Sequence, residues 1–422
     1  MGNLRSRIVS WVTRRYLARA QKKGFDLAKV LPDSALMPLK RTGLDPVPDL
    51  ATAREQAPVS KLPVPFGLNV WLVSGYDEAK AVLGDGASFS NDFGNLMNKL
   101  GAEVEDNPGG LGFADPPVHT RLRRLLTPEF TMRRLARLKP GIEAIVAERL
   151  DAMDKVDGPV DLVEEFALPI PSLVICELLG VPYEDREAFQ HLAVARFDLF
   201  GGAGASLGAI SESLDYLLGV VQDQRKYPGD GLLGQIIKEH GDEIDDRELA
   251  GLADGVLTGG FETTASMLSL GALVLLRDPD VLRRVHDDDD AAHAFVEEAL
   301  RYLTVVQVAF PRFAREDVEV AGVTIGKGDM VVVSLSGANR DPVLGSGMES
   351  FDGTRDPASH LAFGYGAHRC VGAELARMEL RAAYPALVRR FPRMRLDTSP
   401  DELDFRQASI VYGVEKLPVL LK

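Results

Sequence analysis

Hydrophobic and polar residues alternate along this chain mostly with the spacing of α-helices. Apolar positions recur every three or four residues in four stretches, which predicts helices over 122–153, 247–276, 291–303 and 372–391. Strand-like patterns are few and short, and they cover 69–74, 317–325, 329–335 and 410–414. The acidic run DDDD at 287–290 is interpreted as a solvated loop between two helices. Without an internal repeat or a long linker, the chain is expected to form one large, mainly α domain with small β-sheets (α+β).

The N-terminal segment has a basic amphipathic helix pattern. Arginines and lysines are interleaved there with the apolar residues Leu4, Ile8, Trp11, Val12 and Leu17. Because no continuous apolar segment follows, the pattern is not that of a secretion signal. Two interpretations stay open: a helix that packs on its own domain, or weak attachment to an anionic membrane surface. We divide the chain into this extension and its lead-in, 1–59, and a main domain, 60–422.

Composition narrows the class of protein. The chain has 422 residues, of which 45% are hydrophobic and 26% charged, as in a soluble globular protein. Its net charge of −14 argues against a nucleic-acid partner. Cys176 and Cys370 give no disulfide framework and fit a reducing cytoplasm. No apolar run approaches the roughly 20 residues that span a bilayer.

The helix predicted over 247–276 contains an unusual turn, VLTGGFETTAS at 256–266. Gly259 and Gly260 each cost about 1 kcal/mol relative to alanine inside a helix. Thr263 is placed to hydrogen-bond back to the Gly259 carbonyl, which leaves room for a small ligand or water beside the helix. Glu262 is an adjacent carboxylate that can relay protons. A close helix–helix crossing is the more common reason for paired glycines.

Two further pairs have the spacing of one helix face. Glu298 and Arg301 lie three residues apart, and as a surface pair they would contribute only a few tenths of a kcal/mol. His119 and Arg123 lie four residues apart, so both point the same way and suit an anionic group such as a carboxylate. A solvated basic face is the competing interpretation of the second pair.

Cys370 lies in the stretch HLAFGYGAHRCVG at 360–372, directly before a predicted helix. The positive end of that helix is expected to lower the pKa of the thiol. Gly364 and Gly366 permit a tight turn whose backbone lies close to a bulky planar partner. Such a thiolate can be a nucleophile, a redox sensor or a metal ligand. A zinc site is not expected, because the two cysteines lack the usual spacing.

Together these motifs resemble the cytochrome P-450 family of haem-thiolate monooxygenases, in its soluble bacterial form. The resemblance covers about residues 60–422 and includes the haem-binding signature F-G-x-G-x-H-x-C-x-G at Phe363, Gly364, Gly366, His368, Cys370 and Gly372. It implies the family's triangular-prism fold. It also implies haem b (iron protoporphyrin IX) as cofactor, O2 as co-substrate and Cys370 as the proximal thiolate ligand of the iron.

The resemblance also assigns roles to the other motifs. Glu262 and Thr263 match the acid–alcohol pair that delivers protons during dioxygen activation. Glu298 and Arg301 match the E-x-x-R pair, with Arg355 as its third partner, so that they become a buried network supporting the Cys370 loop. The groups implied to bind the haem propionates are His119, Arg123, Arg312 and His368.

The substrate pocket is the part that the resemblance defines least. Its implied lining is Phe93, Leu96, Met97, Leu111, Leu257, Phe261, Val305, Val306, Val308, Ile410 and Val411, although core packing explains any one of these residues equally well. The expected activity is hydroxylation or epoxidation of a largely apolar small molecule such as a fatty acid, terpenoid, steroid or polyketide. The alternatives are a peroxide-driven or non-oxygenating haem-thiolate enzyme, or a non-catalytic haem-based ligand sensor.

The chain shows no flavin, nicotinamide or iron–sulfur motif, so its electrons must come from elsewhere. We expect a ferredoxin and its reductase as donors, a cytoplasmic location and a monomer. The predicted docking face for an acidic ferredoxin is a basic patch on the cysteine side, made of Arg121, Arg124, Arg369 and Arg377.

Overall fold

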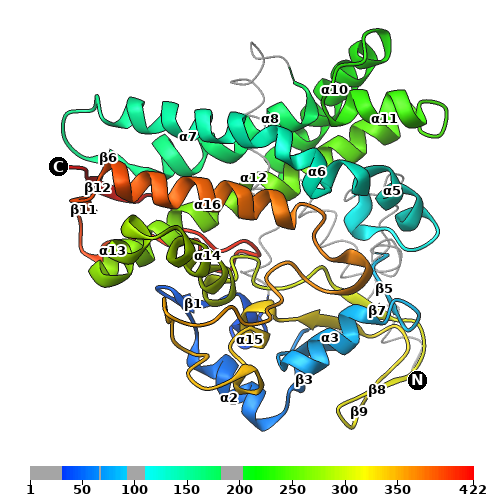
Figure 1. Cartoon of the computed structure of the whole chain (residues 1–422). Coiled ribbons are helices and arrows are strands. Elements are labelled where there is room, and N and C mark those ends of the chain that lie inside the picture. The colour runs from blue at the N-terminus through cyan, green and yellow to red at the C-terminus, as the bar shows by residue number, and fades with distance from the viewer. Residues whose placement is uncertain (1–30, 66–67, 93–109, 182–202) are drawn as a thin grey trace.

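The computed structural model of the chain describes residues 31–65, 68–92, 110–181 and 203–422. Helices form a broad layer, and most of the strands gather with a few short helices at one narrower end, as expected for a mainly α protein with small sheets (Figure 1). The α-helices are α2 (Pro48–Gln56), α3 (Tyr76–Gly84), α5 (Val118–Leu126), α6 (Met132–Leu135), α7 (Lys139–Met153), α8 (Pro169–Leu179), α10 (Ala203–Lys226), α11 (Leu232–His240), α12 (Asp246–Arg277), α13 (Pro279–Asp287), α14 (Asp289–Leu303), α15 (Leu335–Ala338) and α16 (Ala373–Arg390).

The strands are short, and the larger sheet lies at the narrower end. They are β1 (Arg41–Thr42), β2 (Asp45–Pro46), β3 (Val59–Leu62), β4 (Val70–Val73), β5 (Phe89–Ser90), β6 (Val160–Asp161), β7 (Arg312–Ala314), β8 (Val318–Val320), β9 (Val323–Ile325), β10 (Met330–Val333), β11 (Arg395–Leu396) and β12 (Pro418–Leu420). One sheet has the order β3-β4-β10-β7-β5, in which only β4 and β10 are parallel. A second has the order β11-β12-β6, and β1-β2 and β8-β9 are two-stranded.

Helix α12 is the centre of the core. It packs against α8, α10, α14 and α16, and apolar side chains along its length are buried. Asp245 caps its first turn by accepting a hydrogen bond from the Glu248 N–H, as short polar side chains do at helix starts. Contrary to the expectation from sequence, α12 is long and apolar enough to cross a membrane, but 78% of its most apolar window is buried within the fold. Its hydrophobicity therefore reflects a core helix.

The predicted helix over 122–153 is divided, whereas those over 247–276, 291–303 and 372–391 are confirmed as α12, α14 and α16. Helix α5 ends at Leu126, and Pro128 follows in a 3-10 turn because a proline inside a helix removes a hydrogen bond. Pro140 lies in the first turn of α7, where its missing N–H costs nothing.

Two other local predictions were wrong. Residues 287–290 are not a loop, because α13 ends at Asp287, Asp288 caps α14 by accepting from the Asp290 N–H, and the next two aspartates form the first turn of α14. Carboxylates stabilise the positive N-terminal end of a helix, which explains this use of an acidic run. Residues 410–414 form no strand and make only isolated bridges, such as Val306 with Val411.

The described part of the N-terminal lead-in, residues 31–59, packs on the remainder of the fold. The Arg41 guanidinium is buried and donates to the Gln307 side chain and to the Thr304 carbonyl. The Tyr302 hydroxyl donates to Asp45. The basic amphipathic segment at the N-terminus lies outside the described residues, and the division of the chain at residue 59 stays a prediction.

Candidate active site

Cys370 lies between the 3-10 turn η9 (Gly366–His368) and helix α16. Its N–H donates to the Phe363 carbonyl at 2.8 Å, which closes the loop. Gly364 and Gly366 have φ values of 68° and 73°, in the left-handed region that favours glycine. A Cβ added at Gly366 would lie 2.5 Å from the carbonyl oxygen of Leu83 in α3. The loop is therefore pressed against α3. The close approach to a bulky planar partner, for which the sequence suggested these glycines, stays a prediction.

The expected depression of the Cys370 thiol pKa is wrong for the protein alone. Burial among protein atoms raises the thiol pKa, and this exceeds the lowering by the Gly372 N–H and by Arg123, Arg369 and Arg377. The residue as a whole nonetheless keeps an exposed surface. A metal cation at the sulfur would supply the missing positive charge, because coordination deprotonates a thiol. Among the described residues, no group of three His, Cys, Asp or Glu side chains is placed to hold a metal ion by itself.

Histidines from α5 and from the cysteine loop meet beside Cys370. The rings of His119 and His368 have centroids 4.1 Å apart. His119 is buried, and its Nε2 has no hydrogen-bond partner among the described residues. Burial lowers the pKa of His119 and, together with His119 and Arg312, lowers the pKa of His368 to about 3.

Two arginines complete this cluster. Arg123 follows His119 by one helical turn, and Arg312 is held in β7 opposite Val331 of β10. Burial lowers the pKa of both guanidinium groups, to about 10 for Arg312. Within the described ranges neither arginine forms an ion pair with a carboxylate. This largely buried set of cationic and protonatable groups feels the charge of Asp115 but forms no ion pair within the described ranges, and one member has an orphaned ring nitrogen. Such a set fits the two carboxylates of a haem.

The paired glycines of α12 have different surroundings. A Cβ at Gly260 would lie 2.8 Å from Cδ1 of Ile175, so this glycine serves the crossing of α12 and α8. At Gly259 no described atom lies within 4 Å of such a Cβ. The Thr263 hydroxyl donates to the Gly259 carbonyl at 2.7 Å, as predicted. The described residues therefore leave open space beside Gly259, on the turn of α12 that carries Thr263.

Glu262 has a partner that sequence reasoning missed. It is buried, and its carboxylate forms an ion pair with Arg406 from the C-terminal loop. Burial raises the pKa of Glu262 to about 7, while Arg406 opposes this rise and Glu415 adds to it. A carboxyl group with a pKa near neutrality can both accept and donate a proton, which suits acid–base work. No spacing rule connects residues 262 and 406, so the pair could only be found in the fold.

Glu298 and Arg301 are a buried pair and not a surface pair. Arg301 donates to both carboxylate oxygens of Glu298 at 2.8 Å, and Glu298 also accepts from Arg355 at 3.2 Å. The other Arg301 donors are used by the carbonyls of Asn339, Met348 and Ser350. Every polar group in this network is satisfied, as burial of charge requires.

The network reaches the cysteine loop through residues that sequence reasoning missed. The Asn339 side chain accepts from the Leu361 N–H at 2.6 Å, and the Leu361 carbonyl accepts from Gly364 at 2.8 Å. One residue before Glu298, Glu297 pairs with His360, Arg377 and Arg381. His360 and Arg377 lower the pKa of Glu297 to about 2 despite its burial. Helix α14 therefore supports both sides of the loop.

The residues predicted for the substrate pocket are only partly brought together. Leu257, Phe261, Val305 and Val308 are buried, and Leu111 packs against the same core. Val306 bridges Val411, while Ile410 is 45% exposed. Phe93, Leu96 and Met97 lie outside the described residues. Sequence reasoning did not include Phe310, which is 50% exposed, stacks edge-on against Phe113 and lies two residues before Arg312.

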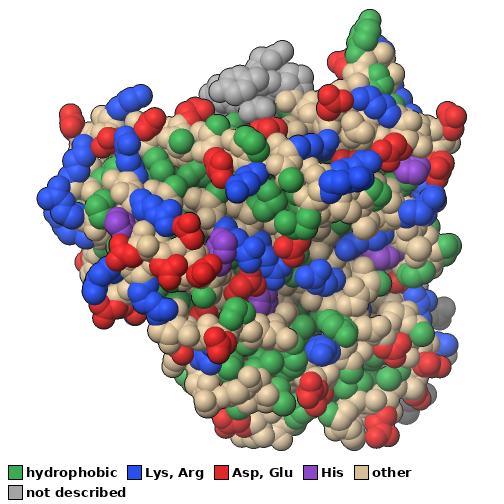
Figure 2. Space-filling model, viewed as in Figure 1, with side chains coloured by type: hydrophobic (Ala, Val, Ile, Leu, Met, Phe, Trp, Pro, Cys, Tyr) green, Lys and Arg blue, Asp and Glu red, His purple; other side chains and the backbone are tan. Residues whose placement is uncertain are grey.

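The predicted basic patch is largely neutralised. Arg121 pairs with Glu248 and Arg124 with Glu243, both from the region around the start of α12. Arg377 is held by Glu297 and Glu374. Figure 2 accordingly shows basic and acidic side chains interspersed over this face. Of the four arginines, only Arg369 is exposed and forms no ion pair within the described ranges.

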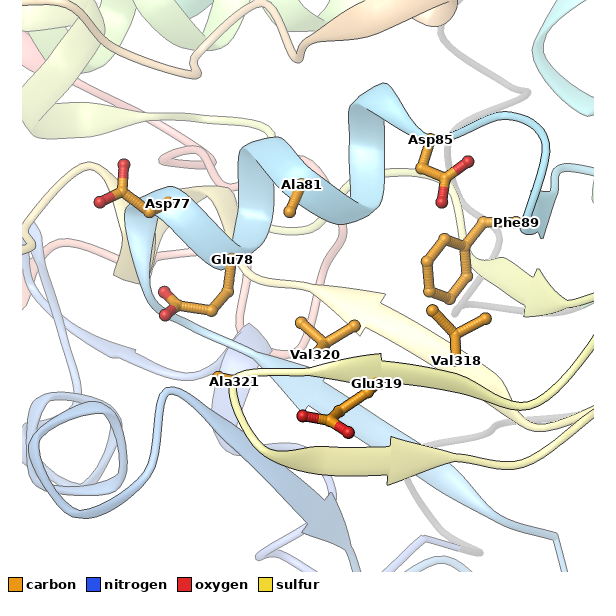
Figure 3. Close-up of a pocket in the computed structure, with 9 residues that line it drawn as sticks. All are labelled: Asp77, Glu78, Ala81, Asp85, Phe89, Val318, Glu319, Val320 and Ala321. Atoms are coloured by element: carbon orange, nitrogen blue, oxygen red, sulfur yellow. The ribbon is translucent and has the colours of Figure 1, made fainter.

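A separate hollow of about 330 Å³ lies between α3 and the β8–β9 hairpin (Figure 3). Four carboxylates line it, from Asp77, Glu78, Asp85 and Glu319, above an apolar floor. None of the predicted site residues contributes to it. Its negative charge would repel the carboxylates of a haem, so it does not compete with the Cys370 region as the cofactor site.

Comparisons with known proteins agree with this geometry. The family model of cytochrome P-450 matches residues 66–227 and 212–413. Cytochrome P-450 165B3 of Amycolatopsis orientalis is 39% identical over 391 residues, which cover 90% of this chain and 97% of the relative. The cytochrome P-450 monooxygenase PikC of Streptomyces venezuelae is 41% identical over 380 residues, covering 89% and 91%.

Solved structures of other proteins also resemble this chain in both fold and sequence. The complex of the X-domain and OxyB from teicoplanin biosynthesis has a TM-score of 0.82 and 40% identity, and the match covers 91% of this chain and 99% of that one. Streptomyces peucetius CYP105P2 in complex with a biphenyl compound has a TM-score of 0.83 and 42% identity, with 90% and 98% covered.

Proposed function

This chain belongs to the cytochrome P-450 family of monooxygenases, and we propose that it hydroxylates or epoxidises a largely apolar small molecule in the cytoplasm. The observation that carries the proposal is the convergence of an exposed cysteine, Cys370, with four cationic or protonatable groups that form no ion pair within the described ranges. Family membership implies a haem with a cysteine thiolate ligand, and the residues present fit that group.

We assign the contacts of the haem residue by residue. Cys370 would ligate the iron, and His119, Arg123, Arg312 and His368 would bind the two propionates. When bound, the haem supplies the dioxygen activation and the oxidising chemistry, with the thiolate pushing electron density toward O–O cleavage. The protein's own task is then to hold the thiolate, to neutralise the propionates and to supply protons.

Proton supply is proposed for the turn of α12 that carries Glu262 and Thr263. Glu262, with a pKa of about 7, can take a proton from solvent and release it at neutral pH. The Thr263 hydroxyl donates to the Gly259 carbonyl, which fixes the oxygen as an acceptor facing away from the helix. No described side chain lies within 4 Å of a Cβ at Gly259, which leaves room there for water or a small ligand.

The substrate class is proposed from the apolar lining and from relatives. Among the latter, pentalenic acid synthase of Streptomyces avermitilis is 39% identical over 383 residues. A fatty acid, terpenoid, steroid or polyketide fits a lining of Leu, Val and Phe side chains, and Phe310 adds an exposed aromatic face. Ligands of these classes should shift the haem spectrum from low to high spin. A panel that gave no such shift would remove this part of the proposal.

Electrons are proposed to come from a ferredoxin and its reductase. The ion pairs of Arg121, Arg124 and Arg377 leave Arg369, together with the exposed Arg133 of α6, as the basic groups for docking. Charge reversal of Arg133 and Arg369 should slow reduction and flatten its salt dependence. Arg393, which is exposed beyond the far end of α16, is the matched control and should have no effect. Equal rates for all three variants would count against this face.

The decisive test is the spectrum of the reduced protein with carbon monoxide. A strongly red-shifted, thiolate-type Soret band that disappears in Cys370→His is expected. A band of the ordinary haem–histidine kind in the unmodified protein would overturn the assignment of Cys370. Product formation with ferredoxin, reductase and dioxygen then separates a monooxygenase from a ligand sensor, which would bind carbon monoxide without turnover.

A further inference from the structure

Arg406 joins the C-terminal loop to the middle of α12. Its Nη1 forms an ion pair with Oε1 of Glu262, and its Nη2 donates to the Ser266 hydroxyl at 3.0 Å. Glu262 and Ser266 lie one helical turn apart on α12, so the guanidinium spans both. None of the sequence motifs includes Arg406.

The backbone of the C-terminal loop fixes the place of this guanidinium. The Arg406 N–H donates to the Gly413 carbonyl at 2.9 Å, and Phe405 forms a bridge with Val414. A Cβ at Gly413 would lie 2.1 Å from Nη2 of Arg406, so any other residue there would displace the guanidinium. The Tyr412 N–H donates to the Val305 carbonyl at 2.7 Å, which ties the loop to the segment after α14.

The side chains of Glu415, Arg406 and Glu262 form a series of charged groups with decreasing exposure. The side chain of Glu415 is 59% exposed, that of Arg406 23% and that of Glu262 8%. The Nε of Arg406 lies 4.0 Å from Oε1 of Glu415. Within the described part of the chain, Arg406 and Glu415 are the charged groups that act on the Glu262 carboxyl, with opposite effects on its charged form.

We propose that Arg406 is a positioning residue, which holds the Glu262 carboxylate in the place from which it supplies protons. The inference rests on the proposed function, in which Glu262 supplies protons beside Thr263. The cation fixes the direction of the Glu262 carboxylate and its affinity for a proton. Gly413 makes this possible by leaving the guanidinium room.

The test titrates Glu262 directly in the haem-loaded protein. Infrared difference spectra across pH report the carbonyl stretch of the protonated acid, and Glu262→Gln identifies its band. Arg406→Gln should raise the pKa of Glu262 by about one unit or more, because an attractive cation is lost. Glu415→Gln should lower it. Gly413→Ala should raise it without any change of charge, whereas Gly86→Ala, where no atom lies within 4 Å, should not move it.

The two variants Arg406→Gln and Glu415→Gln should shift the pKa of Glu262 in opposite directions. A general loosening of the C-terminal loop would instead shift this pKa in the same direction in both variants. An unchanged titration in Arg406→Gln, or shifts of the same sign in Arg406→Gln and Glu415→Gln, would overturn the inference.

Turnover separates this inference from the proposed function. If the titrations shift as expected but Glu262→Gln leaves product formation unchanged, the proposed role of Glu262 is overturned and the positioning by Arg406 is supported. If Glu262→Gln stops product formation while Arg406→Gln leaves both the titration and the pH profile unchanged, the inference fails and the proposed function stands.

Discussion

Gly366 packs directly on the backbone of Leu83, because a Cβ added to the glycine would lie 2.5 Å from the Leu83 carbonyl oxygen. This contact seats the cysteine loop on α3. The neighbouring Tyr365 lies over Gly84, 3.2 Å from the place of a Cβ there, and Lys80 of α3 approaches its ring to 5.2 Å. The position of Cys370 therefore depends on a backbone-to-backbone fit as well as on its own helix.

Gly366→Ala should weaken this fit. We expect a loss of at least about 2 kcal/mol in the free energy of unfolding, because left-handed backbone costs a side chain about 1–2 kcal/mol and the contact adds overpacking. Gly43→Ala is the matched control, since Gly43 has a φ of 59° but no atom within 4 Å of a Cβ. Denaturant unfolding of both variants measures the difference, and equal losses would show that the Leu83 contact contributes nothing.

Arg301→Leu should be strongly destabilising. It leaves the buried Glu298 carboxylate without its main partner and releases three carbonyl groups, which we expect to cost about 3–5 kcal/mol. The pair Asp280–Arg283 has the same three-residue spacing but side chains 83% and 67% exposed, so Arg283→Leu should cost no more than about 0.5 kcal/mol. Chemical denaturation at neutral pH compares the two, and a similar small effect in both would contradict a supporting role for Glu298.

Glu379 should make stability depend on pH. Burial raises the pKa of this carboxyl well above its usual value, and its Oε2 has no hydrogen-bond partner among the described residues. Below the usual pKa of about 4.3 both the folded and the unfolded chain hold the proton; as pH rises, the unfolded chain releases it first and the folded state loses stability.

Glu379→Gln should therefore be more stable than the unmodified protein at pH 7, with the difference shrinking toward pH 4. Unfolding free energies measured across this range provide the test. Glu316→Gln, at an exposed site, should show no such trend. A constant difference between Glu379→Gln and the unmodified protein would mean that the carboxyl does not titrate on unfolding.

Gly271→Ala should destabilise the centre of the core. The Tyr384 hydroxyl donates to the Met267 carbonyl of α12, and a Cβ at Gly271 would lie 2.0 Å from that hydroxyl oxygen. We expect a loss of about 1–3 kcal/mol, the usual range for overpacking. Gly255→Ala on the same helix has no atom within 4 Å of the new Cβ and should be neutral or stabilising by up to about 1 kcal/mol. Thermal unfolding of both variants decides whether helix propensity or the Tyr384 contact dominates.

The features that could be predicted from the sequence are those formed by residues close together in the chain. The helix propensity of 247–276, the back-bond from Thr263 and the turn before α16 all depend on residues within a few positions of one another. The family signature then assigned the Cys370 loop as a whole.

Other features depended on residues far apart in the chain. The pKa of Glu262 depends on Arg406, 144 positions away, and the ion pairs of Arg121 and Arg124 join α5 to the region around the start of α12. The thiol pKa was misjudged because burial depends on the whole fold and outweighs the nearby helix end. Long-range pairing and desolvation are tertiary properties that no periodicity reveals.

The single residue Asp288 between α13 and α14 has a mechanical consequence. The linker between α13 and α14 is one residue long, and its side chain caps the second helix. The angle between the two helices is therefore fixed, and we call the pair a bracket. One arm of this bracket begins at Pro279, next to the end of α12. The other arm carries Glu297, Glu298 and Arg301 to the loop of Cys370. Inserting even one glycine beside Asp288 would allow α14, which supports the Cys370 loop, to change its position relative to α12.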